Sequence, residues 1–203
     1  MNSKIYNQKM IAGEKYQIQM LISGGQTGVD RAALDFALRA GINCAGWCPL
    51  GRKAEDGPIS AVYPLKETQS EKYQQRTRLN VKDSDATLIL TDGGPSRGTA
   101  LTANLCLHYR KPFFVFDFAK TANERQKHAS RRFFEPAMLE QAAKWLCRIQ
   151  PHILNIAGPR ASECPQAAVV TPDILGLLLK KSEALKPEWP PARPHTPDLP
   201  ADQ

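Results

Sequence analysis

Ser23-Gly24-Gly25-Gln26-Thr27-Gly28-Val29-Asp30-Arg31 is the stretch of sequence that decides the fold. It overlaps the end of a short apolar run, residues 18–23, which has the length of a buried strand, and a helical pattern starts at its far end. Glycines between a strand and a helix let the backbone turn tightly and approach an anion, and the unpaired N–H groups of the new helix attract negative charge. The stretch therefore predicts a strand, a phosphate-binding turn and a helix in succession.

Strand-like and helix-like patterns alternate along the rest of the chain. Apolar residues recur at helical spacing from Val29 to Ala40, and Gly41 ends this helix. Apolar runs predict further strands at 44–48, 86–90, 113–118 and 153–156, and helices are expected at 71–84, 100–109, 134–149 and 172–185. Thr171 is the expected N-cap of the last helix. The alternation predicts an α/β protein, a three-layer sandwich in which helices cover both faces of a mostly parallel central sheet of about five strands.

One domain is expected, because 203 residues with 42% hydrophobic and 23% charged composition suffice for a single core. We assign it to residues 17–185, with a flexible leader at 1–16 and a disordered proline-rich tail at 186–203. Residues 50–69 carry glycines, prolines and charges and predict a long irregular loop. Loops of that length inside a domain are more often functional than idle.

The chain has a formal charge of +7 and five scattered cysteines. The charge suits nucleic acid, a membrane surface or a phosphorylated small molecule, but no run of five like charges or basic-aromatic patch favours nucleic acid. Because the cysteines form no paired motif, neither a disulfide framework nor a metal site is expected. The cysteines are expected to be buried free thiols in a reducing cytoplasm. No apolar segment is long enough to span a bilayer, so a cytoplasmic protein without a membrane partner is predicted.

Two further glycine turns follow strands, Thr91 to Thr99 and Ala157 to Arg160. Parallel strands bring such turns to one edge of the sheet, and ligands bind there at the point where strand order reverses. We therefore expect the three turns to form one cleft for an anionic, phosphorylated ligand. A side chain at Gly25 would block this anion site. The expected binding residues are Gly24, Gly25, Gln26, Thr27, Gly28, Arg31, Lys53, Asp56, Asp92, Gly93, Gly94, Gly98, Thr99, Gly158 and Arg160.

Several of these charged residues have a second interpretation. Arg31 could reach a phosphate or pair with Asp35 across one helical turn. Lys53 could anchor an anion and Asp56 could accept from a ribose, pterin or base, but charged residues of a surface loop are usually only solvated. Arg76 and Arg78 are expected on a solvated helix face.

Known catalytic and nucleotide-binding motifs are missing from the sequence. Neither of the first two loops has the Walker lysine, the first is not Gly-x-Gly-x-x-Gly, and the four histidines have no partners that suggest a triad or metal site. No catalytic or metal-ligating residue is assigned.

Five segments in order resemble one known family. They are Ile22-Ser-Gly-Gly-Gln-Thr-Gly-Val-Asp-Arg-Ala-Ala-Leu-Asp35, Gly46-Trp-Cys-Pro-Leu-Gly-Arg-Lys-Ala-Glu-Asp-Gly-Pro-Ile59, Arg78-Leu-Asn-Val-Lys-Asp-Ser-Asp-Ala-Thr-Leu-Ile-Leu-Thr-Asp-Gly93, Gly98-Thr-Ala-Leu-Thr102 and Leu154-Asn-Ile-Ala-Gly-Pro-Arg-Ala-Ser162. Over residues 18–180 the chain resembles the putative molybdenum carrier family, the YpsA-related branch of the SLOG superfamily of Rossmann-like proteins.

The resemblance implies an oligomeric subunit, a dimer or tetramer, that binds molybdenum cofactor (molybdopterin) or a related phosphorylated, nucleotide-like ligand. Related SLOG enzymes hydrolyse nucleoside monophosphates and carry a glutamate where this chain has Thr102. The carboxylate that assists glycosidic cleavage in those enzymes is missing here, so another acid would have to replace it. The alternative is a nucleotide-processing enzyme that cleaves an N-glycosidic bond with Glu55, Asp56 or Asp92 as acid or base. A third interpretation is a regulatory partner protein that uses the basic surface and the proline-rich tail.

Overall fold

The computed structural model describes residues 18–119 and 135–185. The predicted leader and the predicted proline-rich tail lie outside the described residues, as does the start of the helix expected at residue 134. All statements below concern the two described ranges.

The centre of the molecule is a five-stranded sheet in which every neighbouring pair of strands is parallel. The order across the sheet is β2-β1-β9-β7-β8. The strands are β1 (Met20–Ile22), β2 (Asn43–Ala45), β7 (Ala86–Thr91), β8 (Phe113–Asp117) and β9 (Ile153–Ala157). The prediction of a mostly parallel sheet of about five strands is confirmed.

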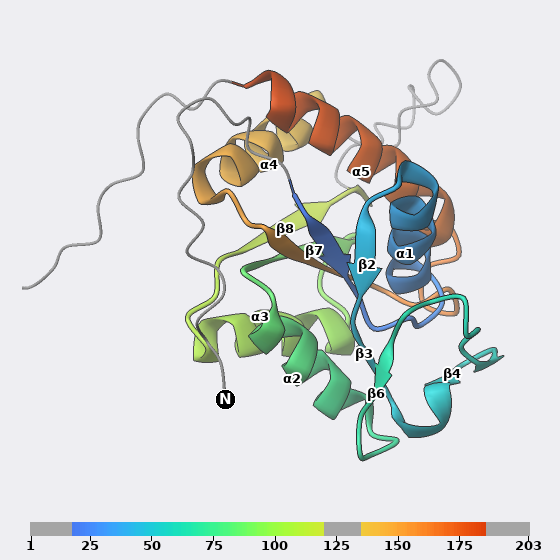
Figure 1. Ribbon diagram of the computed structural model, residues 1–203. Coiled ribbons are helices and arrows are strands. Elements are labelled where there is room, and N and C mark those ends of the chain that lie inside the picture. The colour runs from blue at the N-terminus through green and yellow to red at the C-terminus, as the bar shows by residue number, and fades with distance from the viewer. Residues whose placement is uncertain (1–17, 120–134, 186–203) are drawn as a thin grey trace, which may run out of the picture.

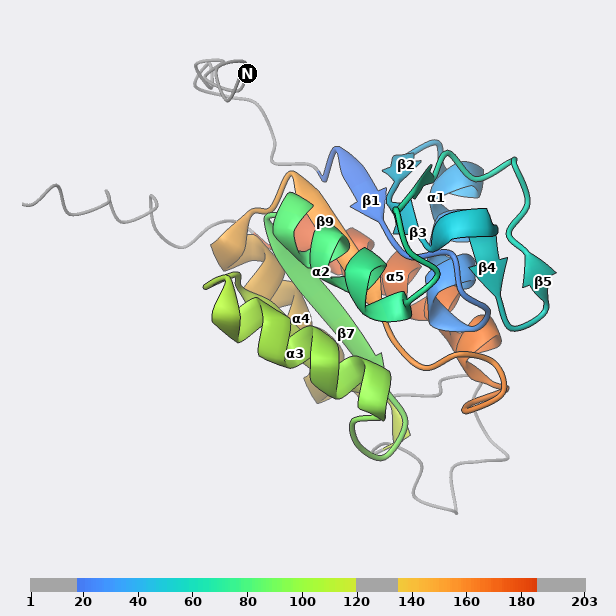
Figure 2. The ribbon, with the colours of Figure 1, turned by 90° about the horizontal axis from the view of Figure 1, so that it is seen from below.

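Helices cover both faces of this sheet, as Figure 1 shows. On one side α1 (Val29–Ala40) and α4 (Pro136–Ile149) each pack against α5 (Ala167–Ala184). On the other side α2 (Tyr73–Asp83) packs against α3 (Arg97–His108), and both lie in front of the sheet in the view of Figure 2. The molecule is therefore a three-layer, Rossmann-like α/β protein.

β7 is buried at all six positions because both of its faces are covered. Its alternate residues Ala86, Leu88 and Leu90 belong to the main apolar core, together with buried residues of α4 and α5. Between them Thr87 accepts a hydrogen bond of 3.2 Å from the side-chain amide of Asn155 on β9. The sheet is thus held by apolar packing on one face and includes a polar pair between its two central strands.

The strand order places a reversal at the centre of the sheet. If counting starts at β9, the order β2-β1-β9-β7-β8 reads 3-2-1-4-5, which is the strand order of a Rossmann fold. The reversal lies between β9 and β7, and ligands of such folds bind beyond the carboxyl ends of the strands at this point. The turns after these two strands are the second and third glycine turns of the sequence.

The strand expected at 44–48 is divided into β2 and β3 (Trp47–Cys48) at Gly46, which has a φ of 145°. A Cβ atom on Gly46 would lie 2.0 Å from the carbonyl oxygen of Ser23, so only glycine permits this close approach. Beyond the break β3 leaves the central sheet and pairs with β6 (Lys66–Glu67).

The loop at 50–69 is more ordered than the sequence predicts. It contains a 3-10 turn (Leu50–Arg52) and an antiparallel pair, β4 (Lys53–Ala54) and β5 (Gly57–Pro58). The guanidinium of Arg52 donates to four backbone carbonyls, at 2.7 to 3.2 Å, of Ile59, Ser60, Tyr63 and Leu65. One arginine therefore fixes the path of the whole loop, and β4 and β5 lie at its outer side in Figure 2.

The last helix begins earlier than expected. α5 starts at Ala167, and Thr171 and Pro172 lie inside it, so the prediction of Thr171 as N-cap is wrong. The Thr171 hydroxyl instead donates to the carbonyl of Ala167 at 2.6 Å. Pro172 is the sixth residue of α5 and removes one backbone hydrogen bond, a loss that the packing of α5 against α1 and α4 offsets.

Candidate functional site

A cleft of about 300 Å³ lies at the strand reversal. Its walls are the end of the first glycine turn and the start of α1, the first half of α2, the start of α3, and the turn after β9. Four of the predicted binding residues line it, namely Gln26, Gly98, Gly158 and Arg160. Parts of all three glycine turns therefore meet in one cleft, but the other predicted residues lie outside its lining.

The start of α3 is the open part of this cleft. Ser96 is the N-cap and its hydroxyl accepts a long, 3.4 Å hydrogen bond from the backbone N–H of Thr99. A Cβ atom on Gly98 would meet nothing closer than 3.8 Å, and the backbone N–H groups of Arg97 and Gly98 have no acceptor among the described residues. Free N–H groups at a helix N-terminus favour a negatively charged ligand.

Three arginines line the cleft, Arg76, Arg97 and Arg160. Arg76 forms an ion pair of 2.9 Å with Asp30, and Arg160 forms one of 3.1 Å with Glu163. Both acids also line the cleft, so three positive charges face two negative ones and the five side chains leave a formal charge of +1. With the start of α3 added, the electrostatic character of the cleft is positive.

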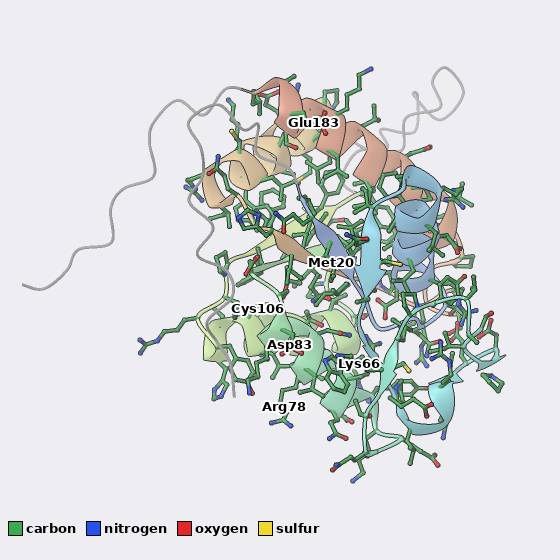
Figure 3. All side chains as sticks on the ribbon, viewed as in Figure 1. Met20, Lys66, Arg78, Asp83, Cys106 and Glu183 are labelled. Carbon is green, nitrogen blue, oxygen red and sulfur yellow. The ribbon has the colours of Figure 1, made fainter. Side chains whose placement is uncertain are left out.

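The pair of Asp30 and Arg76 forms the deepest part of the wall. The Asp30 side chain is 3% exposed and that of Arg76 is 15% exposed. Burial raises the pKa of Asp30 above its ordinary value, and the neighbouring guanidinium acts in the opposite direction. The expectation that Arg76 and Arg78 share a solvated face is wrong for Arg76 and holds for Arg78, which points outward from α2 in Figure 3.

The glycines of the first turn are required by packing within the protein. A Cβ atom on Gly24 would lie 2.1 Å from the guanidinium of Arg76, which rests directly on this residue. One on Gly25 would lie 2.6 Å from Leu65 and 3.1 Å from Ile59, both of the long loop. A side chain at Gly25 would therefore unpack this loop, so such a variant does not report on anion binding alone.

Gly28 and Gly158 join the first turn to the third. A Cβ atom on Gly28 would meet the backbone of residues 159–161 at 2.5 to 2.8 Å, and one on Gly158 would meet Val29 at 2.4 Å. The N–H of Val29, at the start of α1, donates to the carbonyl of Pro159 at 3.2 Å. The start of α1 is thus occupied by protein, in contrast to the open start of α3.

A network around Glu55 holds the first turn, the long loop and the third turn together. Its carboxylate accepts from the hydroxyl of Thr27, and from the backbone N–H of Ser162 at 3.1 Å and its hydroxyl at 2.5 Å. Arg160 lies 3.6 Å away. Burial raises the pKa of Glu55, but these hydrogen bonds together outweigh it and hold the pKa below its ordinary value.

Arg31 and Asp56 pair with each other outside the cleft lining. The guanidinium donates to both carboxylate oxygens of Asp56, one bond being 3.1 Å, and to the carbonyl of Gly25 at 3.2 Å. Asp35, the partner considered for Arg31, accepts from the hydroxyl of Tyr63 at 2.7 Å instead. The hydrogen bond from Arg31 holds the pKa of Asp56 below its ordinary value.

The other charged candidate of the long loop also has a partner. Lys53 forms an exposed ion pair of 2.9 Å with Glu71. The long loop therefore contributes none of its charged residues to the cleft lining, and its ion pairs hold protein segments together.

Asp92, Gly93, Gly94 and Thr99 of the second turn also lie outside the lining. Asp92 accepts from the Gln166 amide at 2.6 Å and from the Cys164 thiol at 3.3 Å, which ties the second turn to the segment between the third turn and α5. Burial is the main cause that raises the pKa of the Cys164 thiol to about 11, and the neighbouring Asp92 carboxylate adds to it. Asp117 likewise accepts from the N–H of Gly93 at 2.9 Å.

The sequence prediction missed the whole α2 side of the cleft. The residues that line it in addition are Asp30, Tyr73, Gln74, Arg76, Thr77, Ser96, Arg97, Leu101, Thr102, Ala157 and Glu163. Arg97 stands within the second glycine turn and could have been found there. No local signal shows that α2 packs beside α3, so Tyr73 to Thr77 could not be found from the sequence.

No group of three metal-ligating side chains occurs within residues 18–119 and 135–185. Over the same residues, no helix is long and apolar enough to cross a membrane.

The fold and the position of the cleft define a Rossmann-like protein with a pocket at its topological switch point. The chain belongs to the circularly permutated YpsA SLOG family, whose pattern matches residues 21–179. The strand order supports this description, because moving β9 to the front restores the Rossmann order. The expected family and the expected Rossmann-like fold are confirmed.

A solved structure from Syntrophus aciditrophicus SB, described as a "putative molybdenum carrier protein", is similar to this chain. The two share 39% sequence identity with a TM-score of 0.70 over 82% of this chain and 98% of the other. Comparison with curated proteins finds no match.

Proposed function

We propose that this protein binds and carries a small phosphorylated, nucleotide-like ligand in the cleft at the strand reversal, with molybdenum cofactor as the leading candidate for its cargo. The observation that carries the proposal is the open N-terminus of α3 beside three arginines. Backbone N–H groups and guanidinium groups are the usual donors to phosphate. The similar structure described as a molybdenum carrier supports the choice of cargo.

The phosphate would bind at the start of α3. The N–H groups of Arg97 and Gly98 are available there, and the exposed Arg97 side chain has no ion pair among the described residues. Arg160 could add terminal N–H groups, because its contact with Glu163 uses only Nε. A formal charge of +1 and the helix dipole together would offset most of the charge of a phosphate monoester.

The remaining part of the cleft would hold the ring of the ligand. Tyr73 supplies an aromatic surface in its wall, and Leu101 an apolar one. The cleft volume of about 300 Å³ lies at the lower end of the range for small-molecule sites, about 300–1,000 Å³. A ring with a single phosphorylated arm fits this size better than a dinucleotide does.

The hydrolytic alternative gains no support from the positions of its acids. Glu55 is used by Thr27 and Ser162, and Asp56 by Arg31. Asp92 accepts from Gln166 and Cys164. Binding and release therefore remain the proposed activity. We place the protein in the cytoplasm, since buried thiols suit a reducing compartment, and we propose that it is a homo-oligomer.

The test is a comparison of Arg97→Gln with Arg78→Gln. Both variants remove one exposed positive charge, but only Arg97 lines the cleft. Titration calorimetry with adenosine monophosphate, guanosine monophosphate and molybdopterin should give binding that Arg97→Gln weakens at least about tenfold, as expected for loss of a charged hydrogen bond. Arg78→Gln should bind like the unaltered protein.

Native mass spectrometry with elemental analysis of the freshly isolated protein identifies the cargo and the number of subunits in the same experiment. A phosphorylated compound that leaves when Arg97 is changed supports the proposal. No retained ligand together with no binding of any of the three probes would refute it.

A further inference from the structure

Gln26 differs from the other residues of the first turn because its side chain lines the cleft while it is only 7% exposed. Its Oε1 accepts two hydrogen bonds, from the backbone N–H of Thr27 at 2.9 Å and from that of Glu55 at 3.0 Å. Both partners can only donate, so this end of the amide must be the oxygen. The orientation of the side chain and the position of its nitrogen are thereby fixed.

The Nε2 group has no hydrogen-bond acceptor among the described residues. This nitrogen is not among the buried side-chain atoms without a partner, so it is open to water in the cleft, and a ligand that displaces this water must offer an acceptor or lose the hydrogen bond. Two backbone bonds prevent the amide from rotating to find an acceptor elsewhere. A donor held in such a rigid position, in the wall of a cleft and open to water, is suited to bind an acceptor of a ligand.

Two other side chains in the cleft wall are also hydrogen-bond donors. Arg76 and Arg160 line the same cleft, and the acids that face them already take part in ion pairs. The part of a ligand that contacts this wall must therefore present oxygen or nitrogen lone pairs. A ligand that presents N–H groups here would displace the water at Gln26 Nε2 without replacing its hydrogen bond.

We propose that Gln26 is a specificity-determining residue whose Nε2 donates a hydrogen bond to an acceptor oxygen of the ligand. The inference rests on the proposed function and names the chemistry that this wall selects. Such an oxygen belongs either to the phosphoryl group or to a ring carbonyl, as in guanine or an oxopterin. Adenine, which has an amino group in place of that carbonyl, distinguishes these two sources.

The decisive variant is Gln26→Glu. A carboxylate keeps one oxygen for the N–H groups of Thr27 and Glu55, so the turn stays in place, but it replaces the donor by a second acceptor. The matched control is Gln74→Glu, which adds the same negative charge to the wall of the same cleft at an exposed position. Loss of affinity beyond that of the control measures the lost hydrogen bond and the new repulsion.

We expect Gln26→Glu to weaken guanosine monophosphate binding about 10- to 100-fold more than Gln74→Glu does, with an unchanged thermal midpoint. If the acceptor is a ring carbonyl, adenosine monophosphate binding falls no further than in the control. If it is a phosphoryl oxygen, binding of both nucleotides and of inorganic phosphate falls alike. Either pattern supports the proposal.

A pH series separates the hydrogen bond from a merely structural role. A protonated glutamate regains an O–H donor, so the affinity ratio of Gln26→Glu to the unaltered protein should rise as the pH falls toward about 5. Equal effects of Gln26→Glu and Gln74→Glu at every pH, in a protein that does bind the probes, would overturn this inference and leave the proposed function standing. If the unaltered protein binds none of the probes, the proposed function itself fails.

Discussion

Removing the guanidinium of Arg76 should destabilise the protein strongly, because Asp30 depends on it. The Asp30 side chain is 3% exposed, and its ion pair with Arg76 measures 2.9 Å. Breaking a buried pair from one side costs about 3–5 kcal/mol, since the remaining charge has no partner. Arg76 is itself 15% exposed, and Asp30 keeps a hydrogen bond from the backbone of Gln26, so we expect Arg76→Met to cost about 3 kcal/mol near neutral pH.

The cost should depend on pH in a defined direction. The pKa of Asp30 is already raised by burial, and Arg76 is the main influence that lowers it, so the pKa rises further in the variant. Between its ordinary value of 3.8 and the raised value, the folded state binds a proton that the unfolded state does not. Stability therefore falls as the pH rises through this window, by up to about 1.4 kcal/mol per pH unit.

The assay is urea unfolding of the ligand-free protein, followed by tryptophan fluorescence at about pH 5 and about pH 8. Arg76→Met should show the larger deficit at the higher pH. Arg78→Met, an exposed position of the same helix, should stay within about 0.5 kcal/mol of the unaltered protein. Adding Asp30→Asn to Arg76→Met should recover most of the loss, because the unpaired charge is then gone.

Two results would refute this reasoning. A deficit below about 1 kcal/mol at the higher pH would mean that Asp30 is not held by Arg76. A deficit that stays constant with pH, or that Asp30→Asn leaves unchanged, would mean that Arg76 acts through packing alone.

Four further variants, one of them a control, test how the loops are held. Gly28→Ala should lower the free energy of unfolding by about 3 kcal/mol or more, because φ is 75° and a backbone atom lies 2.5 Å from the new Cβ. The control Gly51→Ala has a similar φ of 73° but no described atom within 4 Å of the new Cβ, so it should cost only about 1 kcal/mol in urea unfolding. Arg52→Ala removes four hydrogen bonds to carbonyls and should raise amide exchange throughout 57–65 while costing about 2–4 kcal/mol; unchanged exchange would contradict its role. Because the pKa of Glu55 is lower in the folded protein than its ordinary value of 4.5, the ionised side chain stabilises the fold at pH values above 4.5. This stabilisation is lost as the pH falls through the folded pKa, so Glu55→Gln should reduce the fall of the thermal midpoint over the same pH range. An equally steep curve for the variant would assign the response to another carboxylate.

The fold was predictable because its information is local. The apolar run before Ser23 and the helical spacing from Val29 to Ala40 each fall within a single element, and their alternation determines the fold class. The start of α5 was misplaced because Pro172 is an ordinary signal for a first turn, while the packing of α5 against α1 and α4 extends the helix past it.

The candidate site was predictable only in part, because its shape depends on contacts between distant residues. The first and second turns look alike in sequence, yet Gly24 packs against Arg76 and Gly25 against Leu65, whereas a Cβ atom on Gly94 would meet no described residue within 4 Å. The local sequence does not distinguish a glycine that is needed because another part of the protein packs against it from a glycine that leaves space for a ligand. For the same reason Arg76, in a polar helix, gave no sign of its buried partner.

The position of β9 has a consequence for how the molecule is made. This strand is the last of the sheet to be synthesised, yet it lies between β1 and β7 and joins the two halves of the sheet. Until it emerges from the ribosome, β1 with β2 and β7 with β8 have no shared neighbour, and each presents an open strand edge. Such a chain relies on long-range pairing, which is slow and exposes edges to aggregation. Its nascent forms should therefore need chaperones more than an unpermuted Rossmann protein of equal length does.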